Sequence, residues 1–265
     1  MYAMAGGRCI EYQRMPAKKK DRPTLVFLHE GLGCVAQWRD FPRRVAEATG
    51  CAALIYSRYG HGQSDVCDAP RGVRFMHDEA LLALPELLTQ LEIHNPLLIG
   101  HSDGASIALI YAGAGVGSVT GLIAMAPHVF VEDISITGIE KARVAWRTTD
   151  LPHKLARYHR DAAKTFAAWN DAWLNPDFRH WNIEEYLPRI ASPILAIQGE
   201  EDEYGSMAQV DAIAAQAPNV QLLKLIECGH APHKDQPEAT LNAVARFILA
   251  GEREPLKNPE PYPRG

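Results

Sequence analysis

The chain has 265 residues and a formal net charge of −5, with 47% hydrophobic and 22% charged residues. This length and composition are typical of one large globular domain, and they exclude a disordered, fibrous or membrane-spanning chain. Because acidic and basic residues are interspersed, no broad positive field is present, and neither nucleic acid nor a membrane is expected as a partner.

The N-terminus and the cysteines indicate where the protein works. Residues 1–15 contain no apolar run of the length that a signal peptide needs, so export is not expected. Five cysteines without a CxxC pair argue against a disulfide framework. The histidines show no HxxxH or HExxH spacing, so no metal site is expected. These features fit a cytoplasmic enzyme with a small-molecule substrate, and they leave its oligomeric state open.

Short aliphatic runs alternate with amphipathic stretches, which predicts an α/β fold with a mostly parallel sheet and helices on both faces. Strands are predicted at Cys9–Met15, Thr24–His29, Ala52–Ser57, Leu97–Gly100, Gly121–Ala126, Ile194–Gly199 and Gln221–Glu227. In five longer stretches, apolar residues recur at three- and four-residue spacing, which predicts helices. These are Trp38–Thr49, Phe75–Leu91, Asp103–Ala112, Met207–Ala217 and Pro237–Ala250.

Residues 128–186 interrupt the alternation, because they read as consecutive helices with no strand between them. We expect them to form a helical cap on a core made of residues 1–127 and 187–250. Residues 251–265 contain four prolines and no periodicity, which indicates an extended tail. Most aromatic residues of the cap are expected to hold its helices together, with one or two lining a pocket. The aromatic residues of the predicted cap include Trp146, Tyr158, Phe166, Trp169, Trp173, Phe178 and Trp181.

A pentapeptide, Gly100-His101-Ser102-Asp103-Gly104, follows a predicted buried strand and precedes a helix. This is the context of the G-x-S-x-G nucleophile elbow, in which small flanking residues let strand and helix approach while the serine backbone is strained. Ser102 is therefore the predicted nucleophile, at the carboxyl end of the sheet and above a helix N-terminus that favours negative charge. The alternative is an ordinary glycine-containing turn between a strand and a helix.

A serine nucleophile needs a base, and the base needs an orienting acid. His230 follows the last predicted strand in Cys228-Gly229-His230 and is the predicted base, while His233 is expected to be structural. Asp202 is the predicted acid, because its short side chain loses less entropy than a glutamate would. The alternatives are Glu200, Glu201 and Glu203 in the same loop, and Glu132 or Asp133 after the preceding strand.

A tetrahedral intermediate also needs hydrogen-bond donors for its oxyanion. One is predicted to be the backbone N–H of Asp103, which directly follows the nucleophile. The second is predicted to be Gly31, because His29-Glu30-Gly31-Leu32-Gly33 follows an apolar strand and its glycines let the backbone turn its amides toward Ser102. A glycine turn without a ligand is the alternative.

Taken together, these motifs resemble the α/β-hydrolase superfamily over residues 9–250, including the chain order serine, acid, histidine. Arg58-Tyr59-Gly60-His61-Gly62-Gln63-Ser64 is similar to the superfamily's R-x-G-x-G-x-S loop, and Gly229-His230 to its base motif. The resemblance implies an α/β-hydrolase fold with an eight-stranded sheet and a helical cap between strands 6 and 7. It also implies hydrolysis without a cofactor, through an acyl-enzyme.

Within the superfamily, Ser102-Asp103-Gly104 and the residues Trp169, Asp171 and Trp173 look most like the valacyclovirase (biphenyl hydrolase-like) group, whose members cleave esters of amino acids. That similarity implies that the carboxylate of Asp103 binds a substrate ammonium group. Alternatively, Asp103 caps the elbow helix or bonds to nearby backbone.

The leading functional hypothesis is hydrolysis of a small carboxylic ester or thioester. A second hypothesis keeps the same three residues and cleaves a carbon–carbon bond in a vinylogous diketone. A third, from a different class, is a non-catalytic protein that uses the fold to bind a ligand, since a fold alone does not establish catalysis.

Overall fold

The computed structural model describes residues 1–250, so the extended tail expected at residues 251–265 lies outside the described residues. Eight strands form one sheet in the order β1-β2-β4-β3-β5-β6-β7-β8. The pairs β1–β2 and β2–β4 are antiparallel, and all other neighbouring strands are parallel. The predicted eight-stranded, mostly parallel sheet is confirmed. Its strands are β1 Tyr2–Ala5, β2 Arg8–Met15, β3 Leu25–Leu28, β4 Ala53–Tyr56, β5 Leu97–His101, β6 Gly121–Met125, β7 Ile194–Gly199 and β8 Val220–Leu225.

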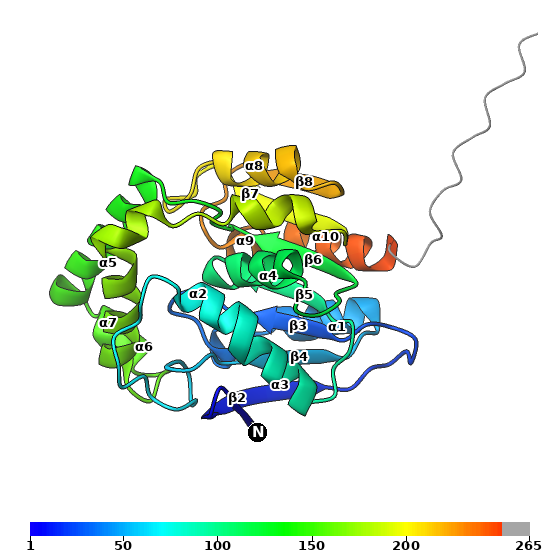
Figure 1. Ribbon diagram of the computed structural model, residues 1–265, viewed down its shortest axis with the longest axis horizontal. Helices are drawn as coiled ribbons and strands as arrows, with labels where there is room; N and C mark the ends of the chain where they lie inside the picture. Colours follow the sequence, from blue (N-terminus) through cyan, green and yellow to red (C-terminus); the bar gives the residue numbers. More distant parts are fainter. Residues whose placement is uncertain (251–265) are drawn as a thin grey trace, which may run out of the picture.

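Helices cover both faces of the sheet, so the central strands are buried on both sides (Figure 1). Along β3, Leu25 and Phe27 belong to the apolar cluster on one face, and Val26 and Leu28 to the cluster on the other. The first face is covered by η1 Val35–Trp38, α1 Phe41–Thr49 and α10 Pro237–Ala250, with α9 Pro232–Asp235 beside them. The second is covered by α2 Phe75–Asp78, η2 Glu79–Ala83, α3 Leu84–Gln90, α4 Asp103–Ala114 and α8 Ala208–Gln216.

Five helical segments separate β6 from β7, where the sequence predicts consecutive helices. We call residues 133–189 the helical insertion. Its helices α5, α6 and α7 lie together beside the sheet, on the left in Figure 1. The division of the chain into core and cap at residues 128 and 186 stays a prediction. The segments are α5 Asp133–Thr148, α6 Leu151–Leu155, α7 Ala162–Trp173, η3 Pro176–His180 and η4 Glu184–Arg189.

Most elements lie within two residues of their predicted bounds, and three differ by more than that or in kind. Strand β1 was not predicted, because it has four residues of which only Ala3 and Ala5 are buried. The helix predicted to begin at Trp38 begins at Phe41, since Arg39 has a φ of 54° and separates η1 from α1. The helix predicted at 75–91 contains a π-helical turn, η2. Pro85 follows that turn, and the wider turn is consistent with a proline that has no N–H to donate to the preceding turn.

The five cysteines are all free thiols. None of the helices within residues 1–250 has both the length and the apolar content needed to cross a bilayer. Over the same residues, no three His, Cys, Asp or Glu side chains are grouped closely enough to hold a metal ion.

Candidate active site

Ser102 forms the turn between β5 and α4, with a φ of 54° that non-glycine residues rarely adopt. The flanking glycines are required by close packing. A Cβ on Gly100 would lie 2.4 Å from the Cα of Ala105, and one on Gly104 would lie 2.1 Å from the carbonyl oxygen of Leu28. The sequence therefore builds a sharp elbow that holds the serine at the carboxyl edge of the sheet.

Three residues from three separate loops meet at this edge. The Nε2 atom of His230 lies 2.9 Å from Oγ of Ser102. The Nδ1 atom of the same ring lies 2.8 Å from each carboxylate oxygen of Asp202. Asp202 follows β7 and His230 follows β8, and because these parallel strands end at one edge, their loops bring both side chains to Ser102.

The charges around His230 favour an ionised Asp202 and an imidazole that readily takes a proton. Burial by itself would lower the pKa of His230, but the hydrogen bond and the charge of Asp202 raise it above its ordinary value. Burial would raise the pKa of Asp202, yet its interactions with His230 lower it. Nδ1–H therefore donates to Asp202, which leaves the unprotonated Nε2 to accept the hydroxyl proton of Ser102.

Asp202 is also held by its own loop. Its Oδ1 accepts hydrogen bonds from the N–H groups of Tyr204 (2.8 Å) and Gly205 (3.2 Å), and its Oδ2 accepts one from Nε2 of Gln198 (2.8 Å). These bonds fix the carboxylate before a substrate arrives, which is what an orienting acid requires.

The alternative acids make other contacts. Glu203 accepts a hydrogen bond at 3.3 Å from the backbone N–H of His230, not from its ring. Glu132 accepts bonds from the N–H and Oγ of Ser206 at 2.9 and 2.6 Å. Asp133 pairs with Arg179 on the surface. Of the carboxylates considered from the sequence, Asp202 is the one placed against the imidazole.

Two further histidines lie beside this group. Nε2 of His101, inside the elbow, donates to the carbonyl oxygen of His230 at 2.7 Å and so restrains the loop of the proposed base. Burial lowers the pKa of His101 to about 4, which keeps the ring neutral near pH 7. His233 packs in α9 between the rings of Trp38 and Phe41, at centroid distances of 5.0 and 5.4 Å.

The loop that carries Gly31 is held through its carbonyl groups. The guanidinium of Arg58 donates to the carbonyl oxygens of His29 and Glu30, both at 2.8 Å, and Nε2 of His61 donates to that of Gly31 at 2.9 Å. For the N–H groups of Gly31 and Asp103, residues 1–250 supply no acceptor. Asp103 is the first residue of α4, where N–H groups have no partner within the helix.

The carboxylate of Asp103 is buried, and within residues 1–250 only its Oδ1 has a hydrogen-bond partner, while Oδ2 has none. Its Oδ1 accepts a hydrogen bond from Nε1 of Trp173 at 3.2 Å, and its Oδ2 lies 3.9 Å from the guanidinium of Arg58. Burial raises the pKa of Asp103, and Arg58 opposes that rise. The helix-capping contact considered from the sequence is not formed by this side chain, because the bond to Trp173 engages it instead.

A cavity of about 70 Å³ adjoins Ser102 and extends beneath the helical insertion. Trp169 and Trp173 are the two aromatic residues of the insertion that line it. His128 was not singled out from the sequence, although it lies just beyond β6, at the same edge where Asp202 and His230 follow their strands. Burial lowers the pKa of His128 to about 3. The lining residues are Glu30, Gly31, Leu32, Ser102, Asp103, His128, Ile139, Trp169, Trp173, Tyr204 and His230.

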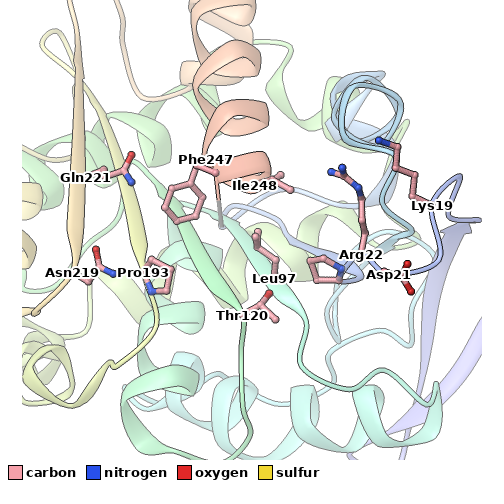
Figure 2. Close-up of a pocket in the computed structure, with 12 residues that line it drawn as sticks. Lys19, Asp21, Arg22, Leu97, Thr120, Pro193, Asn219, Gln221, Phe247 and Ile248 are labelled. Atoms are coloured by element: carbon pink, nitrogen blue, oxygen red, sulfur yellow. The ribbon is translucent and has the colours of Figure 1, made fainter. Parts of the chain in front are cut away.

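A larger cavity, of about 750 Å³, lies at the opposite edge of the sheet. Figure 2 shows Phe247 and Ile248 of α10 above residues at the amino ends of the strands, such as Leu97 and Thr120. Among the described residues that line it, none is a serine, cysteine or histidine.

Comparisons with known proteins show which family the chain matches and which proteins it is similar to. Residues 25–243 match the model of the Alpha/beta hydrolase family. An sn-1-specific diacylglycerol lipase of Mus musculus is 23% identical over 261 residues, which cover 85% of this chain and 81% of the lipase. An enol-lactonase from Burkholderia xenovorans superposes with a TM-score of 0.75 at 18% identity, covering 94% of this chain and all of that one. A meta-cleavage product hydrolase from Pseudomonas fluorescens gives 0.69 at 16%, with coverages of 95% and 98%. At these identities the two structures show a shared fold only.

Proposed function

The chain belongs to the alpha/beta hydrolase family, and we propose that it is a serine hydrolase that cleaves a small carboxylic ester or thioester through an acyl-enzyme. The observation that carries the proposal is the contact of 2.9 Å between Oγ of Ser102 and Nε2 of His230, with Asp202 on the other side of the ring. A hydroxyl held against an oriented imidazole is the arrangement that makes serine nucleophilic near neutral pH.

In the proposed reaction, Oγ of Ser102 attacks the substrate carbonyl while Nε2 of His230 takes the hydroxyl proton. The imidazolium then gives this proton to the leaving oxygen or sulfur as the acyl-enzyme forms. Water then attacks the acyl carbon while Nε2 of His230 takes its proton. The imidazolium returns that proton to Oγ of Ser102 as the ester bond to the serine breaks and the acid product leaves. The charge of Asp202 stabilises the imidazolium in both steps, in line with the raised pKa of His230.

The proposed oxyanion donors are the N–H groups of Gly31 and Asp103, which both line the cavity with Ser102. Their support is that the loop of Gly31 is held by its carbonyls while its N–H has no acceptor among residues 1–250. Donors fixed in advance need no reorganisation when negative charge develops, and each is worth about 3 kcal/mol of transition-state stabilisation.

The dimensions of the cavity favour a short acyl group. Its volume of about 70 Å³ is about half of the roughly 150 Å³ that holds benzene in an engineered protein core. Arg58 lies 3.9 Å from Oδ2 of Asp103 and offsets its negative charge without a hydrogen bond to it. A carboxylate whose charge is already offset favours a neutral acyl group over the ammonium-bearing group that the valacyclovirase resemblance implies. The narrower proposal is therefore a short, uncharged acyl ester.

The test is a series of nitrophenyl esters from acetyl to octanoyl, with an amino-acid ester included. We expect the wild type to prefer the shortest neutral esters, and Ser102→Ala to lower kcat on the order of 10⁶-fold. Ser118→Ala, a change on the exposed surface, is the matched control and should behave as wild type. Wild-type rates in Ser102→Ala would refute the serine mechanism.

The amino-acid ester tests whether the carboxylate of Asp103 binds a substrate ammonium group or contacts only other protein groups. If its carboxylate bound the substrate ammonium, Asp103→Asn would lose activity on this ester far more than on acetyl ester. We expect equal losses on both. The amide of asparagine keeps an oxygen for the indole N–H of Trp173, so the packing between α4 and α7 is preserved.

The other two hypotheses predict different results. A carbon–carbon bond hydrolase would consume a vinylogous diketone, seen as loss of its visible absorbance, faster than any ester in the series. A non-catalytic binding protein would not react with a fluorophosphonate probe. We expect the probe to label wild type at Ser102, with no labelling of Ser102→Ala.

A further inference from the structure

Two tryptophans of α7, Trp169 and Trp173, line the cavity beside Ser102. They are four residues apart and so share one face of the helix. Both are buried, with exposed fractions of 7% and 1%. Both indoles thus face the substrate cavity from the helical insertion, although the nucleophile and its base belong to loops of the sheet.

The two indole N–H groups have different partners. Nε1 of Trp173 donates to Oδ1 of Asp103 at 3.2 Å. For Nε1 of Trp169, the described part of the chain supplies no acceptor. Within residues 1–250 the indole N–H groups of Trp38 and Trp181 also have no partner, but these two residues do not line the Ser102 cavity. Trp169 therefore combines an unused donor with access to the reacting group, and a largely buried donor of this kind usually has a hydrogen-bond partner.

The position of Trp169 relative to Gly31 indicates what its donor would bind. A Cβ on Gly31 would lie only 2.0 Å from Nε1 of Trp169, so the indole nitrogen occupies the place of a side chain at this position. The N–H that we propose as an oxyanion donor belongs to the same glycine. The indole donor and the backbone donor therefore adjoin each other on one wall of the cavity.

The inference rests on the proposed function. We infer that the indole N–H of Trp169 is a third donor to the substrate carbonyl oxygen. This hydrogen bond becomes stronger as the oxyanion forms. The oxyanion site is then shared between the sheet loops and α7. This also explains why residue 31 is glycine, because any side chain there would displace the indole. Trp169 is accordingly a catalytic residue contributed by the helical insertion.

The experiment compares Trp169→Phe with Trp169→Leu, which both lack the donor but fill different volumes. If the donor acts on the oxyanion, both variants should lower kcat for the acetyl ester roughly 10²- to 10³-fold with little change in KM. The affinity for a trifluoromethyl ketone, which forms an oxyanion on addition of Ser102, should fall by the same factor. Trp146→Phe, a tryptophan of α5 that stacks on Phe166 away from the cavity, is the control and should keep wild-type values.

Three results would overturn the inference. They are a wild-type kcat in Trp169→Phe, a loss of kcat with unchanged affinity for the ketone, and a much larger loss in Trp169→Leu than in Trp169→Phe, which would indicate packing alone. Fluorophosphonate labelling of Ser102 in each variant reports whether the protein is folded with a reactive serine. A failure of the proposed function itself would appear separately, as an unlabelled wild type or an active Ser102→Ala.

Discussion

The two edges of the parallel sheet differ in the volume of the cavity beside them and in the chemistry of the residues that line it. At the amino edge, about 750 Å³ is lined by chain that enters the strands and by α10 (Figure 2). At the carboxyl edge, about 70 Å³ is lined by a strained serine, its histidine partner and two indoles. The larger volume has no nucleophile paired with a base among its described lining residues, whereas the smaller one has such a pair at 2.9 Å.

This contrast shows that convergence of side chains, more than volume, identifies the candidate site. Parallel strands deliver the loops that follow them to one edge, so residues far apart in the chain meet there. The residues at the other edge lie at the starts of the strands, in the segments that lead into them or in α10, and we interpret that edge as structural. Three predictions test this division of the molecule into a reactive and a structural edge.

The largest effect is expected from exchanging one aspartate for asparagine at each edge. Asp202→Asn should lower kcat roughly 10³- to 10⁴-fold, because the amide no longer holds the imidazole of His230 in the tautomer that accepts a proton. Asp21→Asn, at the rim of the larger cavity, should leave kcat/KM unchanged. Steady-state kinetics with the acetyl ester measure both, and a comparable loss in the two variants would contradict the division.

The second prediction concerns a substitution at the amino edge that should lower stability and leave activity unchanged. Phe247 of α10 is 7% exposed and lines the larger cavity. Phe247→Ala should lower the free energy of unfolding by about 3 kcal/mol, since it removes buried apolar contacts. It should not change kcat/KM per labelled serine. Urea unfolding gives the stability, and titration with the fluorophosphonate gives the concentration of active enzyme. A specific loss of activity per active site would assign a functional role to the amino edge.

The smallest effect concerns the pH dependence. In the proposed mechanism His230 is the base, so kcat/KM should rise with pH as the imidazole loses its proton, with a midpoint above the ordinary histidine value. The carboxylate of Glu203 contributes to the raised pKa of His230, so Glu203→Gln should move the midpoint to lower pH. Glu92→Gln, in the chain leading into β5, should leave the midpoint in place. An upward shift in Glu203→Gln would contradict the proposed electrostatics.

Several features could be predicted from local sequence because they depend on neighbours in the chain. The central strands are continuous apolar runs, which only burial on both faces explains. The elbow could be predicted because both glycines and the serine fall within five residues. The short strand β1 and the π-helical turn before Pro85 were missed, since β1 is stabilised by pairing with β2 and the turn by the geometry around one proline.

Local sequence was enough to predict the alternation of strands and helices apart from β1, the elbow, and the loops that hold the proposed base and acid, because periodicity and glycine placement are local properties. The sequence favoured Asp202 over its neighbouring glutamates, but its contact with the imidazole and the contact of Trp169 with Gly31 are visible only in the folded chain. Such contacts depend on the paths of separate loops and on the docking of α7. The physical reason is that distances across a folded chain are set by packing, which no single segment specifies.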